Sequence, residues 1–175
     1  MTQQKINVTE LKQYLNNRSQ EELISEISEL FKIFPSVKDY YQIKLYPQES
    51  KEIAARYKKI IEEEFFPSRG LGKARLSVAK KAISDYKKLC RTEVELIDIM
   101  LFFVEQGVKF TDAYGDIDER FYLSMEGIYE QVVVLIAKSK LSAEFQQRCQ
   151  KIVENTSEIG WGFHDTLSEI YEEAF

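Results

Sequence analysis

The stretch TEVELIDIMLFFVEQG, residues 92–107, decides the fold class of this chain. Nine of its sixteen residues are large and apolar, and on a helix drawn at about 100° per residue they leave almost no polar side. Thr92 and Glu95 match a capping box, a pattern typical of a helix start. The stretch therefore predicts a central, buried helix that ends at Gly107, a residue type favoured just after the last helical turn.

The same helical spacing of apolar side chains continues on both sides of this stretch. Pro35, Pro47 and Pro67 fall where three of the expected helices stop, because proline cannot continue a helix. The predicted helices cover about 11–15, 19–34, 36–46, 53–65, 73–91, 92–106, 118–137, 142–153 and 165–174. We expect an all-α fold of eight or nine helices packed as helical hairpins, either as a bundle or as a short HEAT/TPR-like solenoid, in a single domain over residues 1–175.

The composition is that of an ordinary globular protein, with 44% hydrophobic and 30% charged residues in a chain of 175. A chain of this length buries enough surface to fold without a metal or a disulfide, and no cofactor is expected. Cys90 and Cys149 are therefore expected to be reduced thiols. The sequence shows neither an export signal nor an apolar run that could span a membrane, so we expect a cytoplasmic protein.

The net charge of −5 is unevenly distributed along the chain. Residues 69–91 carry a net charge of +7, whereas residues 92–175 carry −11. Helical spacing places the cations of 73–91 opposite the apolar stripe, which predicts a basic face for an acidic partner, lipid headgroups or a phosphate backbone. The alternative is a solvated face whose positive charge balances the acidic residues 92–175. The net negative charge of the whole chain disfavours nucleic acid as the partner. The candidate binding residues on this face are Lys80, Lys87, Lys88 and Arg91, beside Lys73 and Lys81.

Four acids and one glycine lie within residues 112–119, a composition that can indicate a cation-binding loop. The EF-hand spacing fails, because the twelfth position counted from Asp112 is Leu123. In the alternative interpretation, Gly115 lies in a turn and one of the next acids caps the following helix, which explains most of these residues without a ligand. The candidate metal ligands are Asp112, Asp116 and Asp118.

The only tryptophan and the only histidine of the chain lie in the segment IGWGFHD, residues 159–165. Two glycines around Trp161 predict an unusual turn that either locks the indole into the core or faces it toward a pocket. His164 and Asp165 are the candidates for a catalytic base and its carboxylate, although adjacent residues do not share a helix face. The alternative is a structural histidine near a helix start.

Glu95, Asp98 and Glu105 form the one acidic stripe on the otherwise apolar central helix. Buried carboxylates are costly unless they are paired, so a buried stripe requires His164, an arginine or a metal ion beside it. A stripe that reaches solvent requires none of these.

Three segments of the chain together resemble a known family. They are FFPSRG at 65–70, YGDIDERFY at 114–122 and IGWGFHD at 159–165. This combination is similar to a family of uncharacterised bacterial proteins of this length, which is catalogued only as a domain of unknown function. The resemblance covers about residues 11–171. It implies a compact helical bacterial protein without an assigned activity, and it supplies no catalytic residues.

These observations lead to a first hypothesis and two alternatives. The first is a non-catalytic helical binding or scaffold protein that engages another protein through the basic helix or a groove near Trp161. The second is a small metal-dependent or acid–base hydrolase that uses His164, Asp165 and the acids of 112–118. The third is a weak contact with nucleic acid or another anion through residues 73–91. The oligomeric state, and whether segment 112–119 and the His164 turn form one site, stay open.

Overall fold

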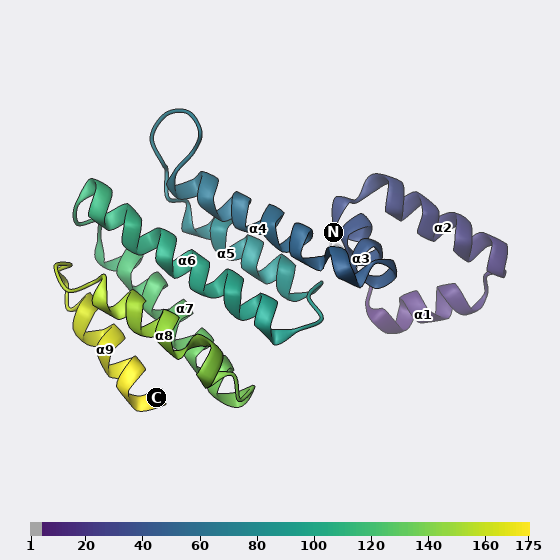
Figure 1. Cartoon of the computed structure of the whole chain (residues 1–175). Helices are drawn as coiled ribbons and strands as arrows, with labels where there is room; N and C mark the ends of the chain where they lie inside the picture. The colour runs from purple at the N-terminus through teal and green to yellow at the C-terminus, as the bar shows by residue number, and fades with distance from the viewer. Residues whose placement is uncertain (1–4) are drawn as a thin grey trace.

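The computed structural model describes residues 5–175, which form nine α-helices and one short 3-10 helix and contain no strand (Figure 1). The all-α prediction is confirmed. The helices are α1 (Val8–Asn16), α2 (Gln20–Ile33), α3 (Pro35–Leu45), η1 (Pro47–Glu49), α4 (Ser50–Phe65), α5 (Leu76–Lys87), α6 (Glu93–Tyr114), α7 (Glu119–Lys138), α8 (Ser142–Glu154) and α9 (Phe163–Ala174). Across residues 5–175, every helix is too short or too polar to cross a lipid bilayer.

Six of the helices form three consecutive hairpins, α4 with α5, α6 with α7, and α8 with α9. The middle hairpin packs against both others, through α4 and α5 on one side and through α8 and α9 on the other (Figure 1). This arrangement covers the apolar stripe that each helix cannot bury alone. The expected packing of helical hairpins is therefore present in this hairpin stack.

Helix α6 lies at the centre of the stack and is longer than the sequence predicts. It continues through Val108 and Phe110, both buried, and ends at Gly115, whose φ of +82° is in the left-handed region. The prediction that Gly107 ends this helix is wrong. A Cβ at Gly107 would lie 2.3 Å from the Sδ atom of Met125 on α7, so this glycine permits the close approach of α6 and α7.

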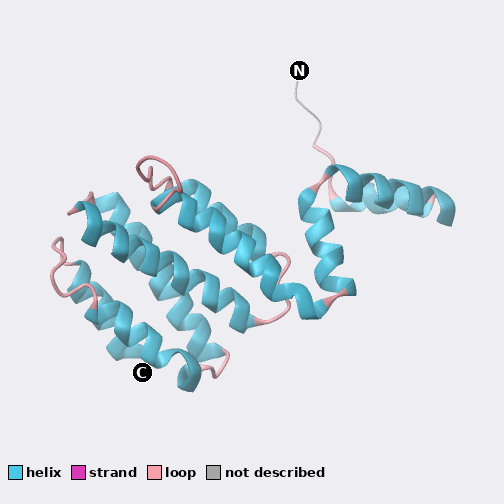
Figure 2. Cartoon of the chain, turned by 45° about the horizontal axis from the view of Figure 1, so that its top comes forward, coloured by secondary structure: helices cyan, strands magenta, loops and turns pink. Residues whose placement is uncertain are grey.

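The first three helices form an N-terminal arm, residues 5–46, which projects from one side of the hairpin stack (Figures 1 and 2). Neither α1 nor α2 contains a buried residue, and the hydrophobic core draws only on residues from α3 onward. Within the arm, α3 is the helix that contacts α4. Its buried Asp39 accepts hydrogen bonds from Arg56 Nη2 at 2.6 Å and from the Tyr57 hydroxyl at 3.4 Å.

The helix boundaries follow local capping chemistry. The predicted capping box at the start of α2 is confirmed, since Ser19 Oγ accepts from the Glu22 amide and the Glu22 carboxylate accepts from the Ser19 amide.

Helix α5 is shorter than the predicted helix over 73–91. Three of the cations expected on that helix, Lys73, Lys88 and Arg91, therefore lie outside it. The last helix starts at Phe163, two residues before the predicted position. Both cysteines are free.

Candidate functional site

The acidic stripe of α6 is paired by an arginine from α8, one of the three partners expected beside buried carboxylates. Arg148 donates to Glu105 through Nε at 2.6 Å and through Nη2 at 2.9 Å. The same guanidinium donates through Nη1 to Asp98 at 2.7 Å, and Lys58 of α4 pairs with the other Asp98 oxygen at 2.6 Å. The network therefore ties α4, α6 and α8 together on one side of the stack.

The electrostatics of this network favour ionised carboxylates. Burial acts to raise the pKa of Asp98, but the hydrogen bonds from Lys58 and Arg148 outweigh it and hold that pKa below its ordinary value. Glu95, the third acid of the stripe, accepts hydrogen bonds from the hydroxyl groups of Tyr86 and Ser50. Each carboxylate of the stripe is thus bonded to a residue of another helix, and Arg148 serves two of them, so the network is an interhelical clamp.

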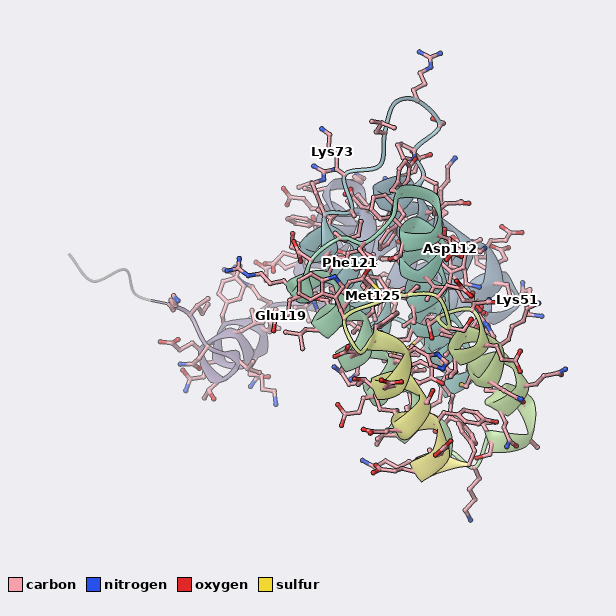
Figure 3. The ribbon with its side chains drawn as sticks, turned by 90° about the vertical axis from the view of Figure 1, so that its left-hand side faces the viewer. Lys51, Lys73, Asp112, Glu119, Phe121 and Met125 are labelled. Carbon is pink, nitrogen blue, oxygen red and sulfur yellow. The ribbon has the colours of Figure 1, made fainter. Side chains whose placement is uncertain are left out.

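The loops that join the two helices of each hairpin lie together at one end of the stack, which we name the loop end (Figures 1 and 3). Aromatic rings join them: Phe66 stacks on Tyr114 at 6.3 Å between ring centroids, and Tyr122 lies 6.5 Å from Trp161. In Figure 3, which faces this end, Phe121 lies between the labelled acids of α6 and α7. The three segments that carry the family resemblance therefore meet here.

A pocket of about 330 Å³ opens at the loop end. It is lined by Thr111, Asp112, Gly115, Asp116, Glu158 and Ile159. Asp116 also accepts a hydrogen bond from the Tyr122 hydroxyl at 3.0 Å, and a Cβ on Gly160 would lie 3.3 Å from its Oδ2 atom. The acidic segment and the start of the Trp161 turn therefore share one pocket, and His164 is not among its lining residues.

The Trp161 turn has an unusual backbone. Trp161 has a φ of +64° and Gly162 a φ of +70°, so two consecutive residues occupy the left-handed region. A non-glycine residue in this region is strained, and such positions concentrate at functional sites. The indole is 61% exposed, so it is not locked into the core, and its inner face rests near the ring of Tyr122. The predicted turn is therefore present, with the indole presented to solvent.

His164 ties the start of α9 to the end of α8. Thr156 is buried, and its hydroxyl donates to the Val153 carbonyl at 2.7 Å. That hydroxyl oxygen is therefore free to accept from His164 Nδ1, which lies 3.0 Å away. Across residues 5–175 no carboxylate forms an ion pair with the His164 ring, and Asp165 is exposed beside it. This geometry supplies a structural contact for the histidine.

The three candidate metal ligands are placed in different local settings. Asp112 lies in the last turn of α6, so the acidic stretch is partly helical, and Asp116 binds the Tyr122 hydroxyl. Asp118 is the N-cap of α7 and accepts from the Phe121 amide at 2.8 Å, as the capping interpretation predicts. Within the described chain, no cluster of three or more histidine, cysteine, aspartate or glutamate side chains is arranged to hold a metal ion.

The basic face of α5 is partly neutralised by its own surroundings. Asp85 forms ion pairs with Lys81 and with Lys88, and these hydrogen bonds lower the pKa of its carboxyl. Lys80 donates to Ser124 on α7 at 3.1 Å. Lys87, on α5, and Arg91, in the loop before α6, are exposed. The predicted binding cations are thus dispersed over a helix and two loops.

Most of the large hydrophobic residues that are exposed in residues 5–175 lie in the N-terminal arm. Thirteen of the nineteen large hydrophobic residues that are exposed in the described chain lie between Ile6 and Tyr46. A groove of about 360 Å³ runs between α2 and α3, lined by Ile27, Ser28, Phe31, Lys32, Tyr41 and Leu45. Soluble proteins rarely expose apolar side chains in such concentration unless another surface covers them.

Sequence reasoning missed two of these features. The apolar spacing in α2 predicts a face but does not say what covers it, so the exposure of the arm went unpredicted. Arg148 was also missed, although a signal exists. It lies one helical turn from Phe145 and from Ile152, at the edge of an apolar stripe, where a cation requires a buried counter-charge.

Comparison with protein families gives a match over nearly the whole chain. A family model described as "Family of unknown function (DUF6155)" matches residues 6–175 of the chain. No curated protein and no solved structure matches this chain. The resemblance to a domain-of-unknown-function family is therefore confirmed over nearly the whole chain.

Proposed function

Because the chain belongs to DUF6155, a family of unknown function, we propose its role from its own surface chemistry: a non-catalytic helical binding protein that docks a partner protein on its N-terminal arm. The observation that carries this proposal is the concentration of exposed apolar side chains between Ile6 and Tyr46. A partner that presents an apolar helical surface is the chemistry that such a surface recognises, because burial of apolar area drives protein association.

The form of the arm supports this proposal. Helices α1 and α2 are well capped at their N-termini and carry clear apolar faces, so their apolar side chains are ordered on one side of each helix. Within the arm, a polar contact joins α1 to α2, because the Tyr14 hydroxyl donates to Glu26 at 2.7 Å, and Arg18 in the connecting loop pairs with Glu22 at 3.1 Å. Phe31 of α2 packs edge-on against Tyr41 of α3, whereas Ile24, Ile27 and Leu30 of α2 stay exposed and are left for another surface.

The other surfaces predicted from the sequence have less support. The basic residues around α5 are partly paired with Asp85, and the sequence as a whole is acidic, which weakens the case for a phosphate backbone. A hydrolase needs a base beside an orienting group in a pocket, and the His164 ring bonds to Thr156 instead. The loop end, with Trp161 exposed, is a second binding surface of the same protein.

Site-specific photo-crosslinking in the native cells tests the proposal. A photoreactive residue replaces Leu30, which is 45% exposed on the arm, or Val134, which is 45% exposed on α7 of the hairpin stack. We expect a covalent adduct with a protein from position 30 and none from position 134. Ile27→Glu in the same chain should remove the adduct, because a charge cannot enter an apolar contact without a large cost. The proposal fails if position 30 gives no adduct, or if Ile27→Glu leaves the adduct unchanged.

A further inference from the structure

We propose that the partner of the N-terminal arm is a second copy of this chain, in a twofold pair in which α2 of each copy packs against α3 of the other. This inference rests on the proposed function and names its partner. It is carried by the shape of the arm, by the signs of its charges and by the place of the arm in the molecule.

The shape of the arm is suited to pairing with itself. The groove between α2 and α3 has apolar walls from Ile27 and Phe31 on one helix and from Tyr41 and Leu45 on the other. One turn before Ile27, the side chain of Ile24 projects from α2 and is 57% exposed. One surface therefore carries both an apolar groove and apolar side chains beside it, so that each copy can fill the groove of the other.

The charges on the two helices are complementary. Helix α2 carries four acids and one lysine, a net charge of −3, which becomes −2 when Arg18 in the preceding loop, paired with Glu22, is counted. Helix α3 carries Lys38 and Lys44, while its only acid, Asp39, is buried and already paired with Arg56 of α4. A contact of α2 with α3 of a second copy therefore matches opposite signs, whereas a contact of α2 with a second α2 would place acid against acid.

The place of the arm keeps the acidic parts of two copies apart. Residues 5–46 have a net charge of zero, whereas residues 92–175 carry −11. The arm projects from the side of the hairpin stack, with α1 and α2 farthest from it (Figure 1). Two arms can meet without bringing the acidic hairpins together, so the repulsion between two chains of like charge is small at this surface. In a twofold pair each favourable contact also occurs twice.

Sedimentation velocity of the purified full chain tests the pairing. Over a concentration series of about 1 to 100 μM, which spans weak to moderate affinities, we expect a shift from the mass of one chain, 20.5 kDa, to that of two. Ile27→Glu and Leu45→Glu should each raise the dimer Kd at least about tenfold. Val134→Glu, at an apolar position on α7 that is about as exposed as Ile27, is the matched control and should leave the Kd unchanged.

Both arm substitutions are at exposed positions, so the fold is expected to persist, and the circular dichroism of each variant checks it. A chain that stays monomeric over the whole series overturns the proposal. So does a dimer that Ile27→Glu and Leu45→Glu do not weaken.

A charge-swap experiment tests the contact of α2 with α3. One variant carries Glu21→Lys and Glu29→Lys on α2, and the other carries Lys38→Glu and Lys44→Glu on α3. Each variant alone places like charges at both contacts and should dimerise at least about tenfold more weakly than the native chain. An equimolar mixture places opposite charges at both contacts and should recover the heterodimer. A mixture that associates no better than the separate variants contradicts this arrangement.

The crosslinking experiment separates this inference from the proposed function. An adduct from position 30 with the mass of two chains supports the twofold pair. An adduct with a different protein, found together with a monomeric chain in sedimentation, leaves the proposed function standing and overturns the pairing with a second copy.

Discussion

At the scale of single residues, Arg148 lies at the centre of a network that connects three helices of the stack. Its guanidinium bonds two carboxylates of α6, and one of these also binds Lys58 of α4. Removing the arginine would leave the half-buried Glu105 without the ion pair that now neutralises it. An uncompensated charge of this kind costs more than the intact pair contributes.

We predict that Arg148→Met lowers the free energy of unfolding by about 2 kcal/mol at neutral pH, below the range for fully buried pairs because these side chains are partly exposed. Urea denaturation measures the change. Arg120→Met on α7, at an exposed arginine, is the matched control and should stay within about 0.5 kcal/mol of the native chain. Equal losses in the two variants would contradict the role given to the network.

The same variant carries a pH signature. Because the pKa of Asp98 is lowered in the folded chain, its pairing stabilises the fold above the unfolded pKa of about 3.9 and is lost as the pH falls through the folded pKa. The difference in stability between the native chain and Arg148→Met should therefore be largest near neutral pH and shrink below about pH 4. A difference that is constant from pH 7 to pH 3 would assign the effect to packing alone.

At the scale of elements, the packing of α6 against α7 depends on a glycine that the sequence pattern places at a helix end. Gly107 faces the fully buried Met125, whereas a Cβ added to Gly127, on α7, would have nothing within 4 Å. The two glycines are both helical, so they differ only in what an added methyl group would meet.

We predict opposite effects for the two substitutions. Gly127→Ala should stabilise the chain by about 0.5–1 kcal/mol, because alanine loses less backbone entropy in a helix. Gly107→Ala should destabilise it by about 1 kcal/mol, because the displacement of Met125 within a packed core outweighs that gain. Thermal unfolding followed by circular dichroism compares them, and a Gly107→Ala chain as stable as Gly127→Ala would show that α7 moves freely.

The sequence predicts the elements well and their environments less well. Spacing and proline positions locate the helices within a few residues, and the capping pattern at Ser19 predicts the start of α2. The prediction at Gly107 is wrong because glycine occurs both at helix ends and where two helices approach closely. Only the packing of the partner helix shows which of these two roles a glycine has. Likewise, the acids of the loop end share a pocket with the Trp161 turn because of the order of the hairpins, which no local pattern encodes.

At the scale of the whole molecule, stability is unevenly distributed. The hydrophobic core is built from α3 to α9, and α1 and α2 contribute no buried side chain. Local stability follows the burial of apolar contacts, so the arm and the hairpin stack should open with different free energies.

We predict that amide hydrogens of α1 and α2 exchange at least about tenfold faster than those of α6 when the chain is dilute. Hydrogen exchange with peptide-level mass spectrometry measures this difference. Raising the protein concentration should slow exchange in α2 and α3 and leave α9 unchanged, because only the arm is covered by a second copy. Arm peptides as protected as α6 in dilute solution would contradict the account of an uncovered arm.

The loop end and the N-terminal arm lie at opposite ends of the molecule (Figures 1 and 2). A twofold assembly joined by its arms would therefore display two Trp161 turns at its distant poles. Such a particle is bivalent, and a target with two copies of one ligand would be held by avidity, with an effective concentration set by the span between the poles. The distance between the ligands on that target would then matter as much as their chemistry.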